Sequence, residues 1–296
     1  MPFNQEPLGP GARARLDKHL EELGDGPLGH ALGEILSDGR FQTERLIWVP
    51  DAPLQGLPVH ALRLDGRYLV ESCEVVYGFS GTMLLHLRGI KGRQNGLALV
   101  VIDSDTLGNA KVEGEAVAAT FRRSRTLSGS EAKRATIQSY LPQALLVHFA
   151  CHAAFDLNRP WESCLQLPSG ELWYAPEWLE ERLGGIPLVT LSACRSGAVS
   201  ALIGGEVFGL VTGFLAGGAR AVLAGLWKLA DRETVEFMCS FYRLCFSHDF
   251  AGALARAQRE ALASEKSSPL YWAPFALFGD SSAIPAPNAA SHSVTG

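Results

Sequence analysis

The sequence predicts an α/β protein with a largely parallel sheet and helices on both faces of that sheet. Strand-like and helix-like segments alternate from about residue 45 to residue 280. Several strand-like segments, such as "GLALVVID" (96–103) and "ALLVHFAC" (144–151), are continuously apolar. Such runs are typical of strands that are buried on both faces. With 296 residues, of which 47% are hydrophobic and 19% charged, the chain is long enough to bury a sizeable core.

The individual elements follow from periodicity and from capping residues. The chain before residue 45 is expected to be helical, because "ARARLDKHLEEL" and "LGHALGEILSDG" repeat apolar residues every three to four positions. Strands are predicted at residues 45–50, 67–78, 96–103, 144–151, 187–194, 219–227 and 274–280. Helices are predicted near residues 80–88, 112–122, 131–140, 175–183, 204–216, 231–246 and 249–263. Ser80, Ser130 and Asp231 are the expected N-caps of three of them.

The expected domain organisation has three parts. Residues 1–44 form an N-terminal helical segment, and residues 45–282 form the α/β domain. Residues 283–296, which contain "IPAPNAASHSVTG", are small, polar and rich in Pro and Ala, so they are expected to be disordered.

Charge and cysteine usage exclude several classes of protein. The net charge is −5 and no Lys/Arg-rich run is present, so the sequence does not suggest direct binding to nucleic acid. The N-terminus has no signal-peptide pattern, and the cysteines are scattered, which favours a cytoplasmic protein with free thiols. They are Cys73, Cys151, Cys164, Cys194, Cys239 and Cys245.

One apolar stretch, residues 207–226, has the length of a membrane span. However, Arg220 lies inside it, and Gly217-Gly218 divides it into a helix-like half and a strand-like half. We therefore expect a buried helix and strand there, and no interaction with a membrane.

Two of the predicted strands lead to reactive side chains. "ALLVHFAC" is followed by His152, and "PLVTLSAC" ends in Cys194. The 41 residues between His152 and Cys194 are enough for a crossover that joins two parallel strands. Neighbouring parallel strands end at the same edge of a sheet, where α/β proteins place ligands and catalytic groups. A thiol next to an imidazole can form the ion pair that attacks an acyl carbon.

The residues after Cys194 suit a nucleophile. Arg195 adds positive potential that favours a thiolate, and Gly197 allows a tight turn whose backbone N–H groups could hold an oxyanion. The sequence has no G-x-S-x-G, Walker, H-E-x-x-H or strand-following G-x-G-x-x-G motif. Gly204-Gly205-Glu206 is more simply a turn before the acidic first turn of a helix.

The other polar residues near His152 are interpreted as structural. His148 lies inside the apolar strand, and the side chain of Cys151 points to the face opposite that of His152. A zinc site made of His148, Cys151, His152 and Cys164 matches no common finger spacing, and a strand would not bring the four groups together. We expect no metal and no cofactor.

The two strand-end segments resemble a known family. "VHFACHAAFD" and "VTLSACRSG" resemble the His and Cys motifs of CHAT domains, a branch of the caspase-like cysteine peptidases that includes separase and metacaspase relatives. The resemblance continues in order from about residue 45 to residue 280. Its other parts are "RLIWVPDAPLQGLPVHALRLDGRYLVE", "GGEVFGLVTGFLAGGARAVLAGLWKLADRETVEFMCSFY", "ALARAQREAL" and "PLYWAPFALFGD". It implies a caspase-like three-layer sandwich.

The resemblance also implies roles for individual residues. His152 would be the general base or thiolate partner, Cys194 the nucleophile, and the backbone N–H groups of Cys194 and Ala153 the oxyanion site. The family usually has Gly at the position of Ala153, and alanine adopts positive φ less readily than glycine. Two functions are therefore open: a cysteine endopeptidase, or a catalytically inactive CHAT-type scaffold or interaction module.

Substrate preference is less defined. Many caspase relatives that cut after Arg or Lys have Asp two residues before the nucleophile, whereas this chain has Ser192. Asp156, Glu206 and Asp231 are acids near the predicted sheet edge that could line a first pocket, although Asp231 also resembles a helix N-cap. We expect a weak preference for a basic residue before the cut.

The resemblance further implies a protein substrate and a regulatory protein partner or an upstream activating protease, in a bacterial signalling or defence pathway. Proteolytic nicking within residues 155–175 or 196–204 is one expected route of activation.

Overall fold

The computed structural model describes residues 10–38, 44–50, 54, 56–154, 159–181, 183–192, 205–227, 231–265 and 267–281. Its centre is an eight-stranded sheet with the order β1-β4-β13-β12-β11-β7-β5-β6. The described residues also form a three-stranded sheet, β10-β9-β8, and the hairpin β2-β3.

The strands of the large sheet agree closely with the predicted ones, except for β6, which was not predicted, and β4, which is only the last part of the predicted strand 67–78. They are β1 (Arg45–Trp48), β4 (Glu74–Tyr77), β5 (Leu97–Ile102), β6 (Ser124–Ser128), β7 (Ala144–Ala150), β11 (Leu188–Leu191), β12 (Ala221–Gly225) and β13 (Phe275–Gly279). The smaller sheets contain β2 (Arg63–Leu64), β3 (Arg67–Tyr68), β8 (His152–Ala154), β9 (Cys164–Gln166) and β10 (Leu172–Tyr174).

The α-helices are α1 (Pro10–Gly24), α2 (Pro27–Ser37), α3 (Leu69–Ser72), α4 (Gly81–Gly89), α5 (Ala110–Thr120), α6 (Arg134–Tyr140), α7 (Gly205–Ala216), α8 (Asp231–Leu244), α9 (Phe250–Leu262) and α10 (Pro269–Trp272). Short 3₁₀ helices are η2 (Val59–Ala61), η3 (Gly129–Glu131), η4 (Leu141–Gln143), η5 (Pro160–Glu162) and η6 (Ala175–Leu179).

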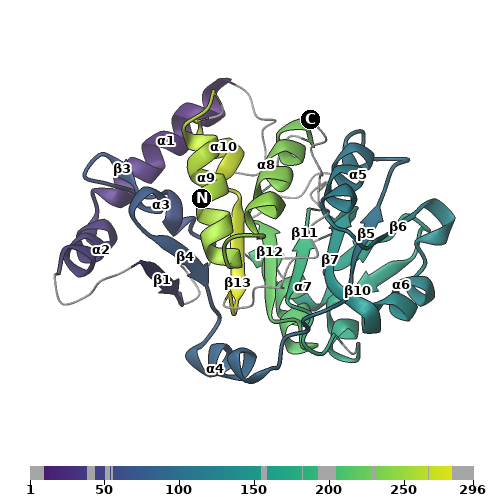
Figure 1. The fold of residues 1–296 in the computed structure, drawn as a ribbon. Helices are drawn as coiled ribbons and strands as arrows, with labels where there is room; N and C mark the ends of the chain where they lie inside the picture. The colour runs from purple at the N-terminus through teal and green to yellow at the C-terminus, as the bar shows by residue number, and fades with distance from the viewer. Residues whose placement is uncertain are drawn as a thin grey trace, which may run out of the picture.

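The large sheet is mostly parallel, as predicted. Strands β12, β11, β7, β5 and β6 run in one direction. Strand β13 is antiparallel to β12, and β4 and β1 continue parallel to β13. In Figure 1 the β13 arrow accordingly points down, while those of β11 and β12 point up. The carboxyl ends of β5, β7 and β11 therefore share one edge of the sheet.

Helices cover both faces of the sheet. Strands β5 and β7 are buried along their whole length, which explains why their sequences are continuously apolar. Alternate residues of β7 point to opposite faces: His148 contacts Tyr242 of α8, whereas Phe149 contacts Trp178 of η6 and Phe214 of α7. Helices α5, α8 and α9 pack together on the first face, and α7 and η6 on the second.

Several expectations about local structure were wrong. The predicted strand 67–78 is divided by α3, because the Glu71 side chain accepts a hydrogen bond from the Tyr68 backbone N–H at 2.7 Å and so stabilises a helical turn. Strand β6 was not predicted because it is a polar edge strand, mostly accessible to solvent. The predicted helix 175–183 is only the 3₁₀ helix η6.

The N-cap predictions had different outcomes. Ser80 caps α4 as expected, because its hydroxyl accepts a hydrogen bond from the Met83 N–H at 3.1 Å. Ser130 is not an N-cap: it lies within η3, and α6 begins only at Arg134 after Lys133. Helix α8 begins at Asp231 itself, and the side chain of that residue lies outside the described part.

The apolar stretch 207–226 is divided as the two glycines suggest. It comprises most of α7 and all of β12, with Gly218 between them at a φ of 103°, a value that favours glycine. Within the described ranges, no helix has the length and apolarity needed to cross a membrane.

The N-terminal helices pack against the α/β domain. Leu16 and Leu20 of α1 and Leu32 of α2 are buried as part of the main hydrophobic core. The boundary after residue 44 stays a prediction, and the expected disordered tail lies almost wholly outside the described residues.

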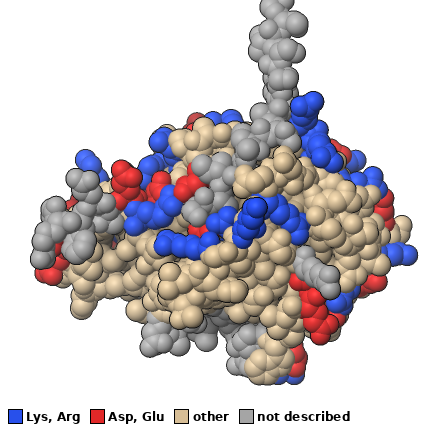
Figure 2. All heavy atoms as spheres, turned by 60° about the horizontal axis from the view of Figure 1, so that its bottom comes forward, with Lys and Arg blue, Asp and Glu red and all other residues tan. Residues whose placement is uncertain are grey.

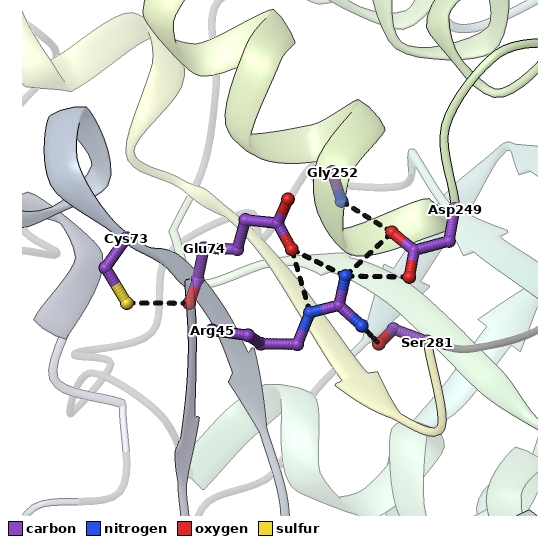
Figure 3. A network of polar contacts seen from close by, with 6 residues as sticks. All are labelled: Arg45, Cys73, Glu74, Asp249, Gly252 and Ser281. Carbon is purple, nitrogen blue, oxygen red and sulfur yellow. Dashed lines mark hydrogen bonds and ion pairs between the residues drawn. The ribbon is translucent and has the colours of Figure 1, made fainter. Parts of the chain in front are cut away.

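Ion pairs and hydrogen bonds of Arg45 connect β1 to residues that are distant in the sequence (Figure 3). The guanidinium donates to Glu74 at 2.5 and 2.8 Å, to Asp249 at 2.7 and 2.9 Å, and to the Ser281 hydroxyl at 3.1 Å. Asp249 is also the N-cap of α9, because it accepts a hydrogen bond from the Gly252 N–H at 2.9 Å. One arginine thus joins β1, β4, α9 and the segment after β13.

His60 is a buried histidine that the sequence did not single out. Its ring nitrogens lie 2.7 Å from the Tyr77 hydroxyl and 2.9 Å from the Ala273 carbonyl oxygen. Burial lowers the pKa of His60 from 6.5 to about 4, because a charged imidazolium would lose its hydration there.

This shift predicts an acid-sensitive stability. Between pH 6.5 and 4 the unfolded chain binds a proton at His60 and the folded chain does not, so stability falls as the pH falls through this window. From pH 7.5 to pH 5 the expected loss from this group is about 2 kcal/mol. Urea unfolding at both pH values should show this loss in the wild type and a smaller one in His60→Gln. His86→Gln, at an exposed position of α4, should behave as the wild type. An equal pH effect in His60→Gln and the wild type would contradict the assignment.

Candidate active site

Three neighbouring strands lead to the same edge of the sheet. Strand β7 lies between β5 and β11, and both pairings are parallel. Asp103 follows β5, His152 follows β7, and β11 is followed by Ser192. The prediction that the two strands leading to His152 and Cys194 are parallel neighbours is therefore confirmed. Cys194 itself lies outside the described residues.

His152 is held in place by a hydroxyl and a carboxylate. Its Nε2 atom lies 2.7 Å from Thr106 Oγ1 and 3.8 Å from Asp103 Oδ2. Thr106 Oγ1 in turn donates to Asp103 Oδ2 at 2.6 Å. The other carboxylate oxygen of Asp103 accepts from the backbone N–H groups of Asp105 and Thr106, at 3.3 and 3.2 Å. The loop after β5 thus folds around Asp103 and presents Thr106 to the imidazole.

These contacts determine which ring nitrogen carries the proton. A hydroxyl has one hydrogen, and that of Thr106 is donated to the Asp103 carboxylate, which can only accept. The Thr106 oxygen must then accept its hydrogen bond from His152, so Nε2 carries the proton in the neutral ring. Nδ1 has no hydrogen-bond partner among the described residues and keeps a free lone pair. The arrangement leaves Nδ1 as a proton acceptor, with Asp103 placed to stabilise the imidazolium.

The backbone around His152 is extended. Residues His152 to Ala154 form β8, which pairs with β9 in the register His152–Gln166, Ala153–Leu165 and Ala154–Cys164. Ala153 is buried, and it does not have a positive φ. Ala153 is therefore accommodated in an extended conformation that imposes no backbone strain.

His148 belongs to a buried polar network behind the site. Its Nδ1 lies 3.0 Å from the Tyr242 hydroxyl, and its Nε2 lies 3.1 Å from Glu113 Oε1, though away from the direction of a good hydrogen bond. Tyr242 donates to Thr190 Oγ1 at 2.8 Å. Thr190 and His148 are partners in the register of β11 and β7. The network therefore connects both strands of the site to α5 and α8.

Cys151 is not exposed to the site. It is fully buried, and burial, together with the nearby charge of Asp103, raises the pKa of its thiol well above its usual value. Such a thiol is protonated at neutral pH and unreactive. The described residues also hold no group of three or more His, Cys, Asp and Glu side chains that could bind a metal.

The candidate specificity residues are only partly described. Ser192 stands at the end of β11, where its N–H donates to the Phe149 carbonyl at 2.9 Å and its hydroxyl has no partner among the described residues. Glu206 lies in the first turn of α7 and Asp231 begins α8, but their side chains are outside the described part. Asp156 lies outside it altogether.

Sequence reasoning missed Asp103 and Thr106. The signal was present in "ALVVIDSDT", where an acid directly follows a continuously apolar strand. The same rule that selected His152 and Cys194 also selects Asp103 when it is applied to the third strand. The role of Thr106 could not be seen in this way, because it depends on how the loop turns back over Asp103.

Comparison with solved structures gives the class of fold. The Arg-specific cysteine proteinase gingipain R (RgpB) has a TM-score of 0.61 and 12% identity, with 95% of this chain and 69% of that chain covered. The complex of the RgpB pro- and mature domains from Porphyromonas gingivalis has a TM-score of 0.60 and 10% identity, with 94% of this chain and 70% of that chain covered. The separase–securin complex of Saccharomyces cerevisiae has a TM-score of 0.52 and 14% identity, with 75% of this chain but only 14% of that chain covered. The chain has the caspase-like α/β fold.

The family follows from a direct match. The model of the CHAT domain matches residues 15–280, so the chain belongs to the CHAT domain family. The match includes most of α1 and all of α2, so it extends into residues 1–44, which the sequence predicts as a separate helical segment. None of the curated proteins matches the chain.

The assigned proton position can be tested directly. In neutral His152, nitrogen NMR of the imidazole should show the proton on Nε2. Thr106→Ser keeps the hydroxyl and should keep this preference, whereas Thr106→Val should weaken it because the acceptor is lost. A proton found mainly on Nδ1 in the wild type, or no difference between the two variants, would contradict the geometry described above.

Proposed function

We propose that this protein is a cysteine endopeptidase in which Cys194 is the nucleophile and His152 its base. The observation that carries the proposal is the hydrogen-bonded series Asp103–Thr106–His152. It fixes the imidazole with a free Nδ1 at the sheet edge to which β11 leads, and Cys194 follows Ser192, the last described residue after β11, by two positions in the sequence. A carboxylate that orients a partly exposed imidazole is the arrangement that activation of a nucleophilic thiol requires, which supports the peptidase over the scaffold.

The reaction follows from these groups. The Cys194 thiol gives its proton to His152 Nδ1, and the thiolate attacks the carbonyl carbon of the scissile peptide. The backbone N–H groups of Cys194 and Ala153 bind the oxyanion of the tetrahedral intermediate. The C–N bond then breaks, the leaving amine takes the proton from His152, and water hydrolyses the acyl-enzyme with His152 again as base. Asp103 stabilises the His152 imidazolium during both the formation and the hydrolysis of the acyl-enzyme, directly and through Thr106.

The comparisons support the class of reaction. Gingipain R, described as an Arg-specific cysteine proteinase, shares the fold over 95% of this chain. A weak preference for a basic residue before the cut is part of the proposal, with Asp156, Glu206 and Asp231 as the acids that would provide it. Ser192, rather than an acid, occupies the position two residues before the nucleophile.

The remaining parts of the proposal concern context. The peptidase acts on a protein substrate in the cytoplasm of a bacterium, as the effector of a signalling or defence pathway. A regulatory protein or an upstream protease activates it, the latter by cutting within residues 155–175 or 196–204.

Replacing the nucleophile tests the peptidase directly. Cys194→Ala should lower cleavage of a diverse peptide library by at least about a thousandfold, because no other group can form the acyl-enzyme. The cut sites are read by mass spectrometry, with and without candidate activating proteins, and they also report the residue preferred before the cut.

Cys151→Ala is the matched control, since it removes a neighbouring thiol that is buried. It should retain cleavage near the wild-type rate. Equal activity of Cys194→Ala and the wild type would exclude the proposed nucleophile, and an inactive wild type under every condition would favour the scaffold function.

The proposed ion pair between the Cys194 thiolate and the His152 imidazolium can be tested without a substrate. Alkylation of Cys194 by iodoacetamide should reach its plateau well below pH 8.5, because His152 stabilises the thiolate, while Cys151 stays unmodified in the folded protein. His152→Ala should move the Cys194 profile toward pH 8.5. Asp103→Asn should move it part of the way, since the imidazolium loses its carboxylate.

His86→Ala serves as the control for replacing an exposed histidine far from this edge. A Cys194 profile that is centred near pH 8.5 in the wild type, or that is unchanged in His152→Ala, would argue against a paired thiolate.

A further inference from the structure

The opposite edge of the sheet has an apolar cavity that the proposed reaction does not use. Its volume is about 20 Å³, and its lining includes Ala98 of β5 and Leu146 of β7. The aromatic side chains of Phe121, Phe246 and Phe250 also line it. Since Leu146 precedes His152 by six residues of extended chain, the cavity lies about 20 Å from the candidate active site. The volume suits one small aliphatic group, and the apolar lining offers a water molecule no partners.

Two arginines stand at the mouth of the cavity. Arg122 and Arg123 line it, and both are exposed. Within the described part of the chain, neither guanidinium has an acidic partner. The backbone of Arg123 is fixed to the sheet, because its carbonyl oxygen accepts a hydrogen bond from the Ala98 N–H at 2.9 Å. The positive charge is therefore held beside the apolar opening and is not neutralised by the protein.

Basic side chains also gather elsewhere on the surface. Figure 2 views the molecule from the side where α4 lies in Figure 1, and Lys and Arg side chains lie across the middle of this face, with Asp and Glu side chains toward its sides. The arginines that are paired elsewhere differ from those at the cavity: Arg243, for example, is bound to Glu260 at 2.7 and 2.9 Å. The charges at Arg122 and Arg123, which lie beside an apolar cavity, are therefore available to an acidic group of another molecule.

We propose that this cavity and its two arginines bind an acidic segment of a protein partner. A small aliphatic side chain of the segment fills the cavity, and a neighbouring carboxylate pairs with Arg122 or Arg123. Arginine binds carboxylates through two parallel hydrogen bonds, which gives such a contact direction as well as attraction. This binding does not depend on the peptidase activity proposed above.

One residue that lines the cavity also contacts the two strands that lead to the candidate active site. Tyr242 lines the cavity, and its hydroxyl contacts His148 of β7 and Thr190 of β11. A segment seated in the cavity therefore touches the residue that holds these two strands together. This position suits a regulatory partner better than a substrate, whose cleaved bond must reach the other edge.

Binding is measured with a defined peptide and the full chain. The probe is the acetylated, amidated peptide Gly-Glu-Val-Glu-Gly, titrated while NMR follows the methyl groups of Ala98 and Leu146. We expect saturable shifts of both methyl groups. The peptide Gly-Lys-Val-Lys-Gly reverses the charge, and Gly-Glu-Gly-Glu-Gly removes the aliphatic group. Both should bind at least tenfold more weakly.

Protein variants separate the charge from the cavity. The double variant Arg122→Glu/Arg123→Glu should weaken binding at least tenfold, whereas Arg67→Glu/Arg88→Glu, which changes the net charge equally at exposed positions, should not. Ala98→Val fills the cavity with two further carbon atoms and should also weaken binding, with both arginines unchanged.

Three results would overturn the proposal. The first is the absence of saturable shifts up to millimolar peptide, and the second is equal affinity for the acidic and basic peptides. The third is tighter binding of a single-stranded oligonucleotide than of the acidic peptide, which would assign the arginines to phosphate. Whether the wild type cleaves peptides, and whether Cys194→Ala abolishes that cleavage, tests only the proposed peptidase activity and not the proposed binding site.

Discussion

The contact between β7 and β11, held by the hydrogen bonds of the buried Tyr242 hydroxyl with His148 and Thr190, is the constraint on which the candidate site depends. A polar network in the interior is costly unless its members find partners, and when they do it favours one arrangement over others. His148 and Thr190 are register partners, and each precedes a proposed catalytic residue, His152 or Cys194, by four positions. A slip of one strand by a single residue would leave Tyr242 without one of its two partners. The network therefore sets the relative positions at which the two strands end.

The chemistry at the edge follows from a second set of contacts. Asp103 is nearly buried, yet its carboxylate accepts hydrogen bonds from two backbone N–H groups and from Thr106, so its charge is compensated within one loop. Through the Thr106 hydroxyl this charge decides the proton position on His152. The active-site geometry thus requires three adjacent strands rather than the two that the His and Cys motifs indicate.

The sequence predicted most of the sheet because burial on both faces leaves a clear trace: β5, β7, β11, β12 and β13 are continuous apolar runs. It failed where local contacts outweigh residue preference. Residues 69–72 have strand-like side chains, but Glu71 stabilises a helical turn there. Polar β6 carries no apolar signal, and its existence follows from pairing with β5. In the site, Asp103 was predictable from the position of an acid after a strand, whereas Thr106 needed the loop geometry.

The ion-pair network of Arg45 has a consequence for how the two ends of the large sheet's sequence are held. Because Arg45 contacts Ser281 across 236 positions of sequence, the start of the first strand, β1, is tied to the segment that follows the last strand, β13. The N-terminal helices α1 and α2, which precede Arg45, pack into the same core, so this tie lies within the folded unit. A force that pulled β1 away from the segment after β13 would therefore be resisted by Arg45 and its carboxylates as well as by the pairing of β1 with β4.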